Sequence, residues 1–71
     1  MKTQHDIRLG TVFTGRVNGV RCKVVGIEVD RFFGRERHVA VCRDLATGER
    51  HRINLDLLRR YEIDIEEEGN A

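Results

Sequence analysis

The sequence predicts an all-β fold: a five-stranded small barrel with one short helical turn before the last strand. Apolar and polar residues alternate in five short segments, and glycine-containing turns separate the segments that would pair. A chain of 71 residues buries only about 60% of the surface that its unfolded form exposes, so the core is thin. We expect one domain at residues 7–65, between a disordered N-terminus at 1–6 and a disordered acidic tail at 66–71.

The first hairpin is predicted by an Asn-Gly pair. In Leu9–Phe13 a glycine precedes a β-branched pair and a phenylalanine, which suits a short first strand. Asn18-Gly19 is the strongest two-residue hairpin signal in the chain, because both residues tolerate the positive φ angles that such a turn requires. It predicts arms near Val12–Val17 and Val20–Val29.

The second of these arms changes phase partway along. Apolar residues or cysteine occupy alternate positions from Val20 to Val24, and the alternation resumes one residue out of phase at Val25, beside Gly26. This pattern predicts a bulge or a sharp bend. A strand bent in this way can serve two sheets, which is how a short chain closes a barrel. The charged stretch Asp30–Arg37 is then expected to form a loop.

The segment Val39–Leu55 predicts the main hairpin. Alternating residues flank a break at Leu45–Gly48, and Gly48 can take the left-handed conformation that closes a three-residue loop. That loop sets a register in which the following residues lie opposite each other: Leu45 and Glu49, Arg43 and His51, Val41 and Ile53, Val39 and Leu55. One face is then apolar, and the other holds Cys42, Arg50, Arg52 and Asn54.

A helical turn and a last strand follow. The helical turn is predicted by the spacing of Leu55, Leu57, Leu58 and Tyr61, with Asn54 as its cap. Beyond it, Tyr61, Ile63 and Ile65 alternate with acidic residues, which predicts a final strand with an acidic outer face.

Five short strands, one bent at a glycine, together with two hairpins and a helical turn before the last strand, resemble the SH3-like small barrels. This group includes KOW and Tudor-type modules. The resemblance covers about residues 9–65 and implies a binding module that acts on nucleic acid or on a peptide. The small plasmid-type dihydrofolate reductases share this fold and carry a Gln-Ile-Tyr triplet. The nearest match, Arg52-Ile53-Asn54, replaces both functional side chains, so a reductase is a remote alternative.

Catalytic groups, metal ligands and cofactor motifs are poorly supplied. The chain contains no serine, which excludes a Ser-His-Asp arrangement. Neither Cys22 nor Cys42 belongs to a C-x-x-C pair, and the predicted register points Cys42 away from His51. We expect two small buried thiols, no enzyme, no metal and no cofactor.

The net charge of +1 hides an uneven distribution. Residues 6–60 hold twelve bases and seven acids, whereas residues 61–71 hold five acids and no base. A basic body suits an anionic partner, while the acidic tail either solubilises the terminus, meets a basic partner or folds over the protein's own arginines. Arginine outnumbers lysine eleven to two, which favours phosphate or carboxylate binding but also follows from a GC-rich genome.

The candidate binding residues are six arginines and two aromatic residues. The arginines of this predicted basic face are Arg35, Arg37, Arg50, Arg52, Arg59 and Arg60. Phe32 and Phe33 lie at a loop tip, where an aromatic ring can stack on a base. We expect a protein-interaction or regulatory domain whose partner is another protein or a second copy, with nucleic-acid binding as the alternative.

Cellular location follows from the cysteines and from hydropathy. Two cysteines without a hydrophobic signal segment indicate a reducing compartment, so we expect a cytoplasmic protein. No apolar run approaches the ~20 residues needed to cross a bilayer, and a membrane partner is not expected.

Overall fold

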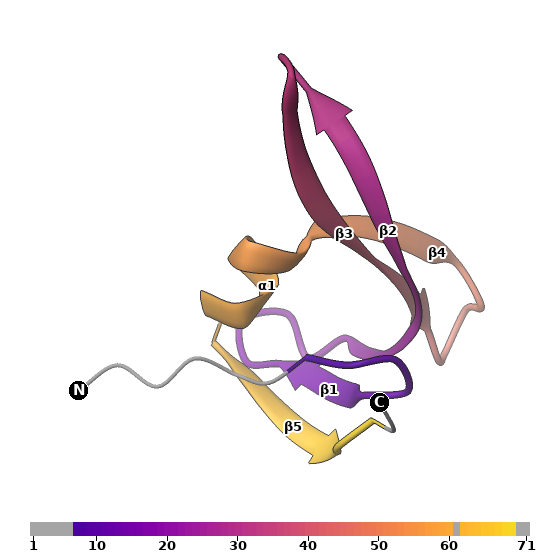
Figure 1. The fold of residues 1–71 in the computed structure, drawn as a ribbon. Coiled ribbons are helices and arrows are strands. Elements are labelled where there is room, and N and C mark those ends of the chain that lie inside the picture. Colours follow the sequence, from indigo (N-terminus) through magenta and orange to yellow (C-terminus); the bar gives the residue numbers. More distant parts are fainter. Residues whose placement is uncertain (1–6, 61, 70–71) are drawn as a thin grey trace.

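The computed structural model describes residues 7–60 and 62–69, which form five strands and one short helix (Figure 1). The elements in chain order are β1 (Val12–Gly15), β2 (Arg21–Phe32), β3 (Arg35–Asp44), β4 (Arg50–Asn54), α1 (Leu55–Arg60) and β5 (Ile63–Glu67). All strands join one antiparallel sheet in the order β4-β3-β2-β1-β5. The predicted β class, the five strands and the helical turn before the last strand are confirmed. β4 and β5 remain open edges among the described residues, so a closed SH3-like barrel is not confirmed.

One side of the sheet and α1 enclose the hydrophobic core. The buried residues of this cluster are Ile7, Phe13, Cys22, Val24, Ala40, Cys42, Leu55, Leu58 and Ile63. The short helix is fixed at its start by Asn54, whose Oδ1 accepts hydrogen bonds from the amides of Asp56 at 2.9 Å and Leu57 at 3.4 Å. The predicted cap is therefore confirmed, and it orients Leu58 toward the sheet.

β2 pairs with β1 and with β3, and it contains a bulge. Its pairing with β3 shifts register between Val24 and Gly26, which leaves Val25 as the extra residue and confirms the predicted irregularity. The bulge has a packing consequence. Val24 lies opposite Cys42 and Ile27 lies opposite Ala40, so the two out-of-phase apolar sets end on the same side of the sheet.

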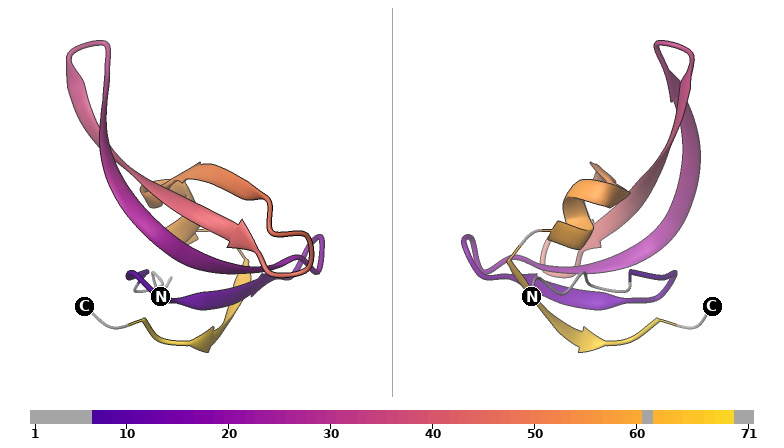
Figure 2. Two further views of the ribbon diagram at one scale, coloured as in Figure 1. Left: turned by 90° about the vertical axis from the view of Figure 1, so that its right-hand side faces the viewer. Right: turned by 60° about the vertical axis from the view of Figure 1, so that its left-hand side comes forward.

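The prediction of a loop at Asp30–Arg37 is wrong. β2 and β3 continue as a two-stranded ribbon that projects beyond the rest of the sheet (Figures 1 and 2). They are joined by a two-residue turn in which Phe33 has φ 51° and Gly34 has φ 74°. Such turns favour Asn or Gly at the first position. Phenylalanine there hides the turn signal in the sequence.

The main hairpin forms between β3 and β4, but its predicted register is wrong by one residue. Val41 lies opposite Arg52, and Ile53 lies opposite Ala40. The remaining predicted pairs shift in the same way, as follows: Arg43 with Arg50, Cys42 with His51, and Val39 with Asn54. A one-residue shift exchanges the faces of one strand relative to its neighbour. The apolar residue of β4 that meets the core is still Ile53, now through Ala40 and not Val41.

The loop between β3 and β4 explains the shift. Asp44, not Leu45, is the last paired residue, and its amide donates to the carbonyl of Glu49 at 2.8 Å. The Asp44 carboxylate also accepts the amides of Ala46 and Thr47, at 2.8 and 3.3 Å. Gly48 has φ 79°, as predicted, and its amide donates to the Asp44 carbonyl at 2.7 Å. The loop therefore holds four residues.

The loop between β1 and β2 has the same form, so the predicted two-residue turn at Asn18-Gly19 is wrong. The amide of Gly15 donates to the carbonyl of Val20 at 3.0 Å, and the amide of Gly19 donates to the carbonyl of Gly15 at 2.8 Å. Only Gly19, at φ 69°, has a positive φ in this loop. Asn18 contributes through its side chain, whose Oδ1 accepts the Val20 amide at 2.9 Å.

The last strand pairs with the first, with Phe13 opposite Ile65 and Gly15 opposite Ile63. It runs to Glu67, two residues past the predicted end of the domain at 65. The predicted disordered N-terminus at 1–6, the end of the tail at 70–71 and Tyr61 lie outside the described residues.

Candidate functional site

Strand pairing divides the sheet into a core side and an outward side. Residues paired directly across antiparallel strands point to the same side, and Ala40 and Cys42 are fully buried in the core. The residues that alternate with them in β3, and their partners in β2 and β4, therefore face away. Within β2, β3 and β4, the charged residues on this outward side from Lys23 onward are Lys23, Arg35, Arg37, Arg43, Arg50 and Arg52, with Glu28 and Asp30. Six bases and two acids give a charge of +4, and we call this surface the basic face. Beyond Lys23 the same side continues through Val12 to the acidic Glu67 of β5.

The basic face lies opposite α1. Figure 2 shows β2 and β3 as a curved ribbon with α1 on the inner side of the curve. The helix packs Leu55 and Leu58 into the core on that inner side. Within residues 7–60 and 62–69, α1 is the only helix, and it does not cover the bases of the outward side.

Three bases lie side by side across three strands of this face. Lys23 lies opposite Arg43, and Arg43 lies opposite Arg50. All three are exposed, and none forms an ion pair with another described residue. Like charges placed directly opposite each other destabilise a sheet. Within residues 7–60 and 62–69, the repulsion in the row Lys23–Arg43–Arg50 is therefore not offset by ion pairs.

Two of the predicted arginines meet at a hollow on the same face. The hollow has a volume of about 330 Å³ and is lined by Asp30, Arg37, Val39, Arg52 and Asn54. Arg52 Nη2 lies 2.9 Å from Glu28 Oε1, and Arg37 Nη2 lies 3.5 Å from Asp30 Oδ2. Arg37 Nε is buried and has no hydrogen-bond partner among the described residues. The cross-strand carboxylates thus hold Arg37 and Arg52 in place at the hollow.

Phe32, Phe33 and Arg35 gather with Arg37 toward the ribbon tip. The Arg37 guanidinium carbon lies 4.7 Å from the centroid of the Phe32 ring, a cation–π contact. The Phe32 and Phe33 rings meet edge to face with their centroids 4.4 Å apart. Arg35 pairs with Phe32 across the ribbon. The two candidate aromatic residues and two candidate arginines are therefore neighbours.

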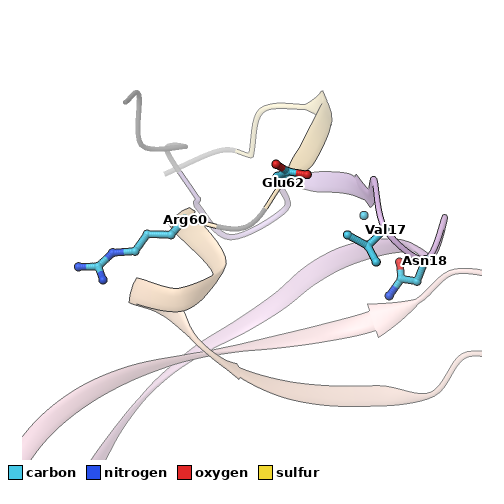
Figure 3. A pocket seen from close by; sticks show the side chains of 5 residues that line it. Val17, Asn18, Arg60 and Glu62 are labelled. Atoms are coloured by element: carbon cyan, nitrogen blue, oxygen red, sulfur yellow. The ribbon is translucent and has the colours of Figure 1, made fainter. Parts of the chain in front are cut away.

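Arg59 and Arg60 are separate from the other four predicted arginines. Both belong to α1, on the core side of the sheet, and Arg59 Nη1 lies 3.8 Å from Asp56 Oδ1. Arg60 borders a pocket of about 430 Å³ with Gly15, Val17, Asn18 and Glu62. Its side chain extends away from Val17 and Asn18 (Figure 3). The structure therefore does not bring these two arginines onto the basic face.

Sequence reasoning missed Arg43 as a member of the face. The predicted register placed it opposite His51, and the stretch before β3 was expected to be a loop. Arg35, Arg37 and Arg43 are separated by even numbers of residues in one strand and so share one of its sides. A strand prediction from Arg35 onward would have revealed them as one set.

The acidic strand is tied to arginines outside the basic face. Arg16 Nη2 lies 2.9 Å from Asp64 Oδ1, and Arg21 Nε lies 2.9 Å from Glu66 Oε2. The Thr14 hydroxyl donates to Glu66 Oε2 at 2.6 Å. Hydrogen bonds from Thr14 and then from Arg21 hold the pKa of Glu66 below its usual value. These two ion pairs agree with one of the three roles expected for the acidic segment, in which its carboxylates fold over the protein's own arginines.

The prediction that Cys42 and His51 point to opposite sides is wrong, because they lie directly opposite each other. Both cysteines are buried free thiols, as predicted. Burial, with Cys22 nearby, raises the pKa of the Cys42 thiol to about 12, and burial followed by the charge of Asp44 raises the pKa of Cys22. Thiols that resist ionisation are weak nucleophiles. Among residues 7–60 and 62–69, no three His, Cys, Asp or Glu side chains are placed to hold a metal ion.

Comparison of the chain with protein-family models, with curated proteins and with solved structures finds no match. Across the described part of the chain, no helix has both the length and the apolar character required to cross a membrane. Geometry and charge therefore carry the functional interpretation.

Proposed function

We propose that this domain is a non-enzymatic binding module that holds the phosphate backbone of a nucleic acid on its basic face. The observation that carries the proposal is the row Lys23–Arg43–Arg50. Three like charges in adjacent strands raise the free energy of the folded protein, and a bound polyanion relieves that repulsion. Arginine forks match phosphate oxygens with two parallel hydrogen bonds.

The proposed fold is a closed SH3-like barrel, which is supported by the strand order and by the helix between β4 and β5. A cytoplasmic location is supported by the two free thiols. A reductase remains remote, because the residues at the relevant triplet have other roles: Arg52 pairs with Glu28, and Asn54 caps α1.

A protein partner or a second copy of the chain is the second candidate. It is favoured by apolar side chains that the ribbon leaves exposed, namely Ile27, Val29, Phe32 and Phe33. These residues suit docking on another chain. They lie on both sides of the ribbon, whereas the bases of β3 and β4 share one face, so we rank nucleic acid first.

The test is a titration of the protein against a fluorescent oligonucleotide at several salt concentrations between about 50 and 200 mM. The triple variant Lys23→Gln/Arg43→Gln/Arg50→Gln removes the row. We expect weaker binding. We also expect the plot of the logarithm of the binding constant against that of the salt concentration to be less steep by about 2 to 3, since each phosphate contact contributes about 0.7 to 0.9 to this slope.

The matched control is Arg16→Gln/Arg59→Gln/Arg60→Gln, which removes the same charge away from the basic face. It should keep most of the affinity and the salt slope. If both triple variants lose binding equally, net charge and not the row is responsible. If the unmodified protein binds neither single-stranded nor duplex DNA at the lowest salt, the nucleic-acid proposal is wrong.

A further inference from the structure

We propose that Phe33 stacks on an unpaired base and that the ligand of the basic face is therefore a single-stranded nucleic acid, an inference that rests on the function proposed above. Three features of the ribbon support it: the backbone conformation of Phe33, the contacts that hold the tip, and the continuity between the tip and the row of bases.

Phe33 occupies its position at a cost to the fold. Its φ of 51° makes it the one non-glycine residue with a left-handed backbone in the described part of the chain. Bulky side chains disfavour this conformation, and Asn or Gly would satisfy the turn better. The ring is 90% exposed, so burial does not repay the cost. Strained, exposed aromatic residues that do not stabilise a fold are candidates for ligand contact.

A chain of contacts orients the side chains at the tip when the ribbon is paired. Asp30 lies 3.5 Å from Arg37, Arg37 lies over the Phe32 ring at 4.7 Å, and Phe32 contacts Phe33 at 4.4 Å between ring centroids. Each contact restrains the next side chain toward the tip. Phe33 thereby contacts Phe32 while most of its ring remains open to solvent.

The tip continues into the basic face along β3. Arg35, Arg37 and Arg43 share one side of this strand, and the distance from the first to the last is about 26 Å at ~3.3 Å per residue. Single-strand binding sites combine such a basic track with aromatic rings on which bases stack, and take roughly 4 to 16 nucleotides. The ribbon offers both components on one continuous surface.

A duplex is a poorer fit than a single strand. An aromatic wedge in a duplex must separate stacked base pairs, a cost that proteins recover by wrapping bent DNA over a large surface. This domain measures only 34 × 34 × 25 Å and presents one outward-facing basic sheet surface. Unpaired bases are already free to stack, so the single strand avoids the cost.

The test compares Phe33→Asn with the unmodified protein in binding to a labelled thymidine oligonucleotide of about 20 nucleotides and to a duplex of the same length. Asparagine tolerates the turn, so the variant should unfold at the same denaturant concentration or a higher one. We expect single-strand affinity to fall by about 5- to 150-fold. The salt slope should stay unchanged, because no phosphate contact is removed.

The control is Val17→Asn, which replaces an apolar residue that is 91% exposed in the loop between β1 and β2. It should bind like the unmodified protein. A single 2-aminopurine in the oligonucleotide reports stacking directly: its fluorescence should fall on binding to the unmodified protein and to Phe33→Trp, but not on binding to Phe33→Asn.

Two outcomes would overturn the inference and leave the basic face intact. In one, Phe33→Asn binds the single strand as tightly as the unmodified protein while the triple row variant does not. In the other, the unmodified protein prefers the duplex and Phe33→Asn weakens both ligands equally. Failure of the unmodified protein to bind either ligand would instead remove the proposed function as well.

Discussion

The body of the domain and the outer part of its ribbon are built on different principles. We define the distal ribbon as residues 27–38 and the body as the other described residues. In the body, Val24 and Leu58 are 0% exposed, whereas in the distal ribbon Val29 is 59% exposed and Phe33 is 90% exposed. The body is stabilised by burial of apolar surface, and the distal ribbon by pairing across two strands.

This difference frees the distal ribbon from a large role in folding, whereas the row Lys23–Arg43–Arg50 lies in the body. Each exposed cross-strand pair contributes only about 0.2 to 1 kcal/mol, and a two-stranded hairpin alone is marginally stable in water. The distal ribbon therefore adds little to the stability of the sheet and is expected to open locally at low free-energy cost. Its aromatic residues and arginines are free to be selected for a ligand.

The largest expected effect is a core truncation in the body. Leu58→Ala should lower the free energy of unfolding by about 2 to 5 kcal/mol, since Leu58 is fully buried and the change leaves a cavity. Leu57→Ala on the same helix is the control, because Leu57 is 48% exposed, and it should cost less than about 1 kcal/mol. Urea unfolding measures both. Equal losses would show that α1 does not close the core.

A pair of identical substitutions compares the two regions directly. Val24→Thr buries a hydroxyl in the core and should cost about 1 to 3 kcal/mol. Val29→Thr makes the same change in the distal ribbon, where the hydroxyl meets water, and should stay within about 0.5 kcal/mol. Thermal unfolding followed by circular dichroism distinguishes them. A large loss for Val29→Thr would mean that the ribbon is part of the cooperative core.

Glycines at the ends of two turns sharpen the comparison. Gly48 and Gly34 both have a left-handed backbone, at φ 79° and 74°, and a Cβ would meet nothing closer than 3.7 Å at either position. Gly48→Ala should therefore cost about 1 to 2 kcal/mol of backbone strain. Gly34→Ala should cost less global stability, because the distal ribbon can open without the body, and should speed amide hydrogen exchange in the ribbon only. Similar losses in urea would contradict local opening.

The smallest expected effect is an acid dependence at the edge of the body. The pKa of Glu66 lies below its usual 4.5 in the folded state, because Thr14 and Arg21 donate hydrogen bonds to it. Its stabilisation is therefore present above pH 4.5 and is lost as the pH falls through the lower, folded-state value. The urea midpoint should fall less steeply with acid in Glu66→Gln than in Glu67→Gln, the control. If the urea midpoints of the two variants fall equally with pH, Glu66 does not stabilise the fold through its ionised form.

Local signals in the sequence were sufficient for the elements but not for their register. The bulge beside Gly26, the cap at Asn54 and the left-handed Gly48 follow from properties of single residues and were predicted correctly. The register of the main hairpin depends on whether the loop has three or four residues, and Gly48 suits both. The side-chain hydrogen bonds of Asp44 to the loop amides decide in favour of four, and sequence pattern does not rank them.

The candidate site was predicted in part for the same reason. Arg50 and Arg52 face outward as expected, because the shift changed their partners in β3 and not their exposure. The row Lys23–Arg43–Arg50 is a property of register, which no local pattern contains. The distal ribbon was missed because Phe33 is an unfavourable turn residue. The left-handed backbone of Phe33, which a sequence pattern does not predict for phenylalanine, is also the feature that suggests a role in binding.

The pairing of β1 with β5 has a consequence for synthesis on the ribosome. These two strands are separated by nearly the whole described chain, yet Phe13 lies opposite Ile65, and Ile63 belongs to the core. Contacts this distant in sequence close late and slow folding. The nascent chain therefore exposes one side of its core until residues 63–67 leave the exit tunnel, whereas the ribbon, formed from neighbouring residues, can pair much earlier. The strands of the ribbon can therefore meet before the core that stabilises them is complete.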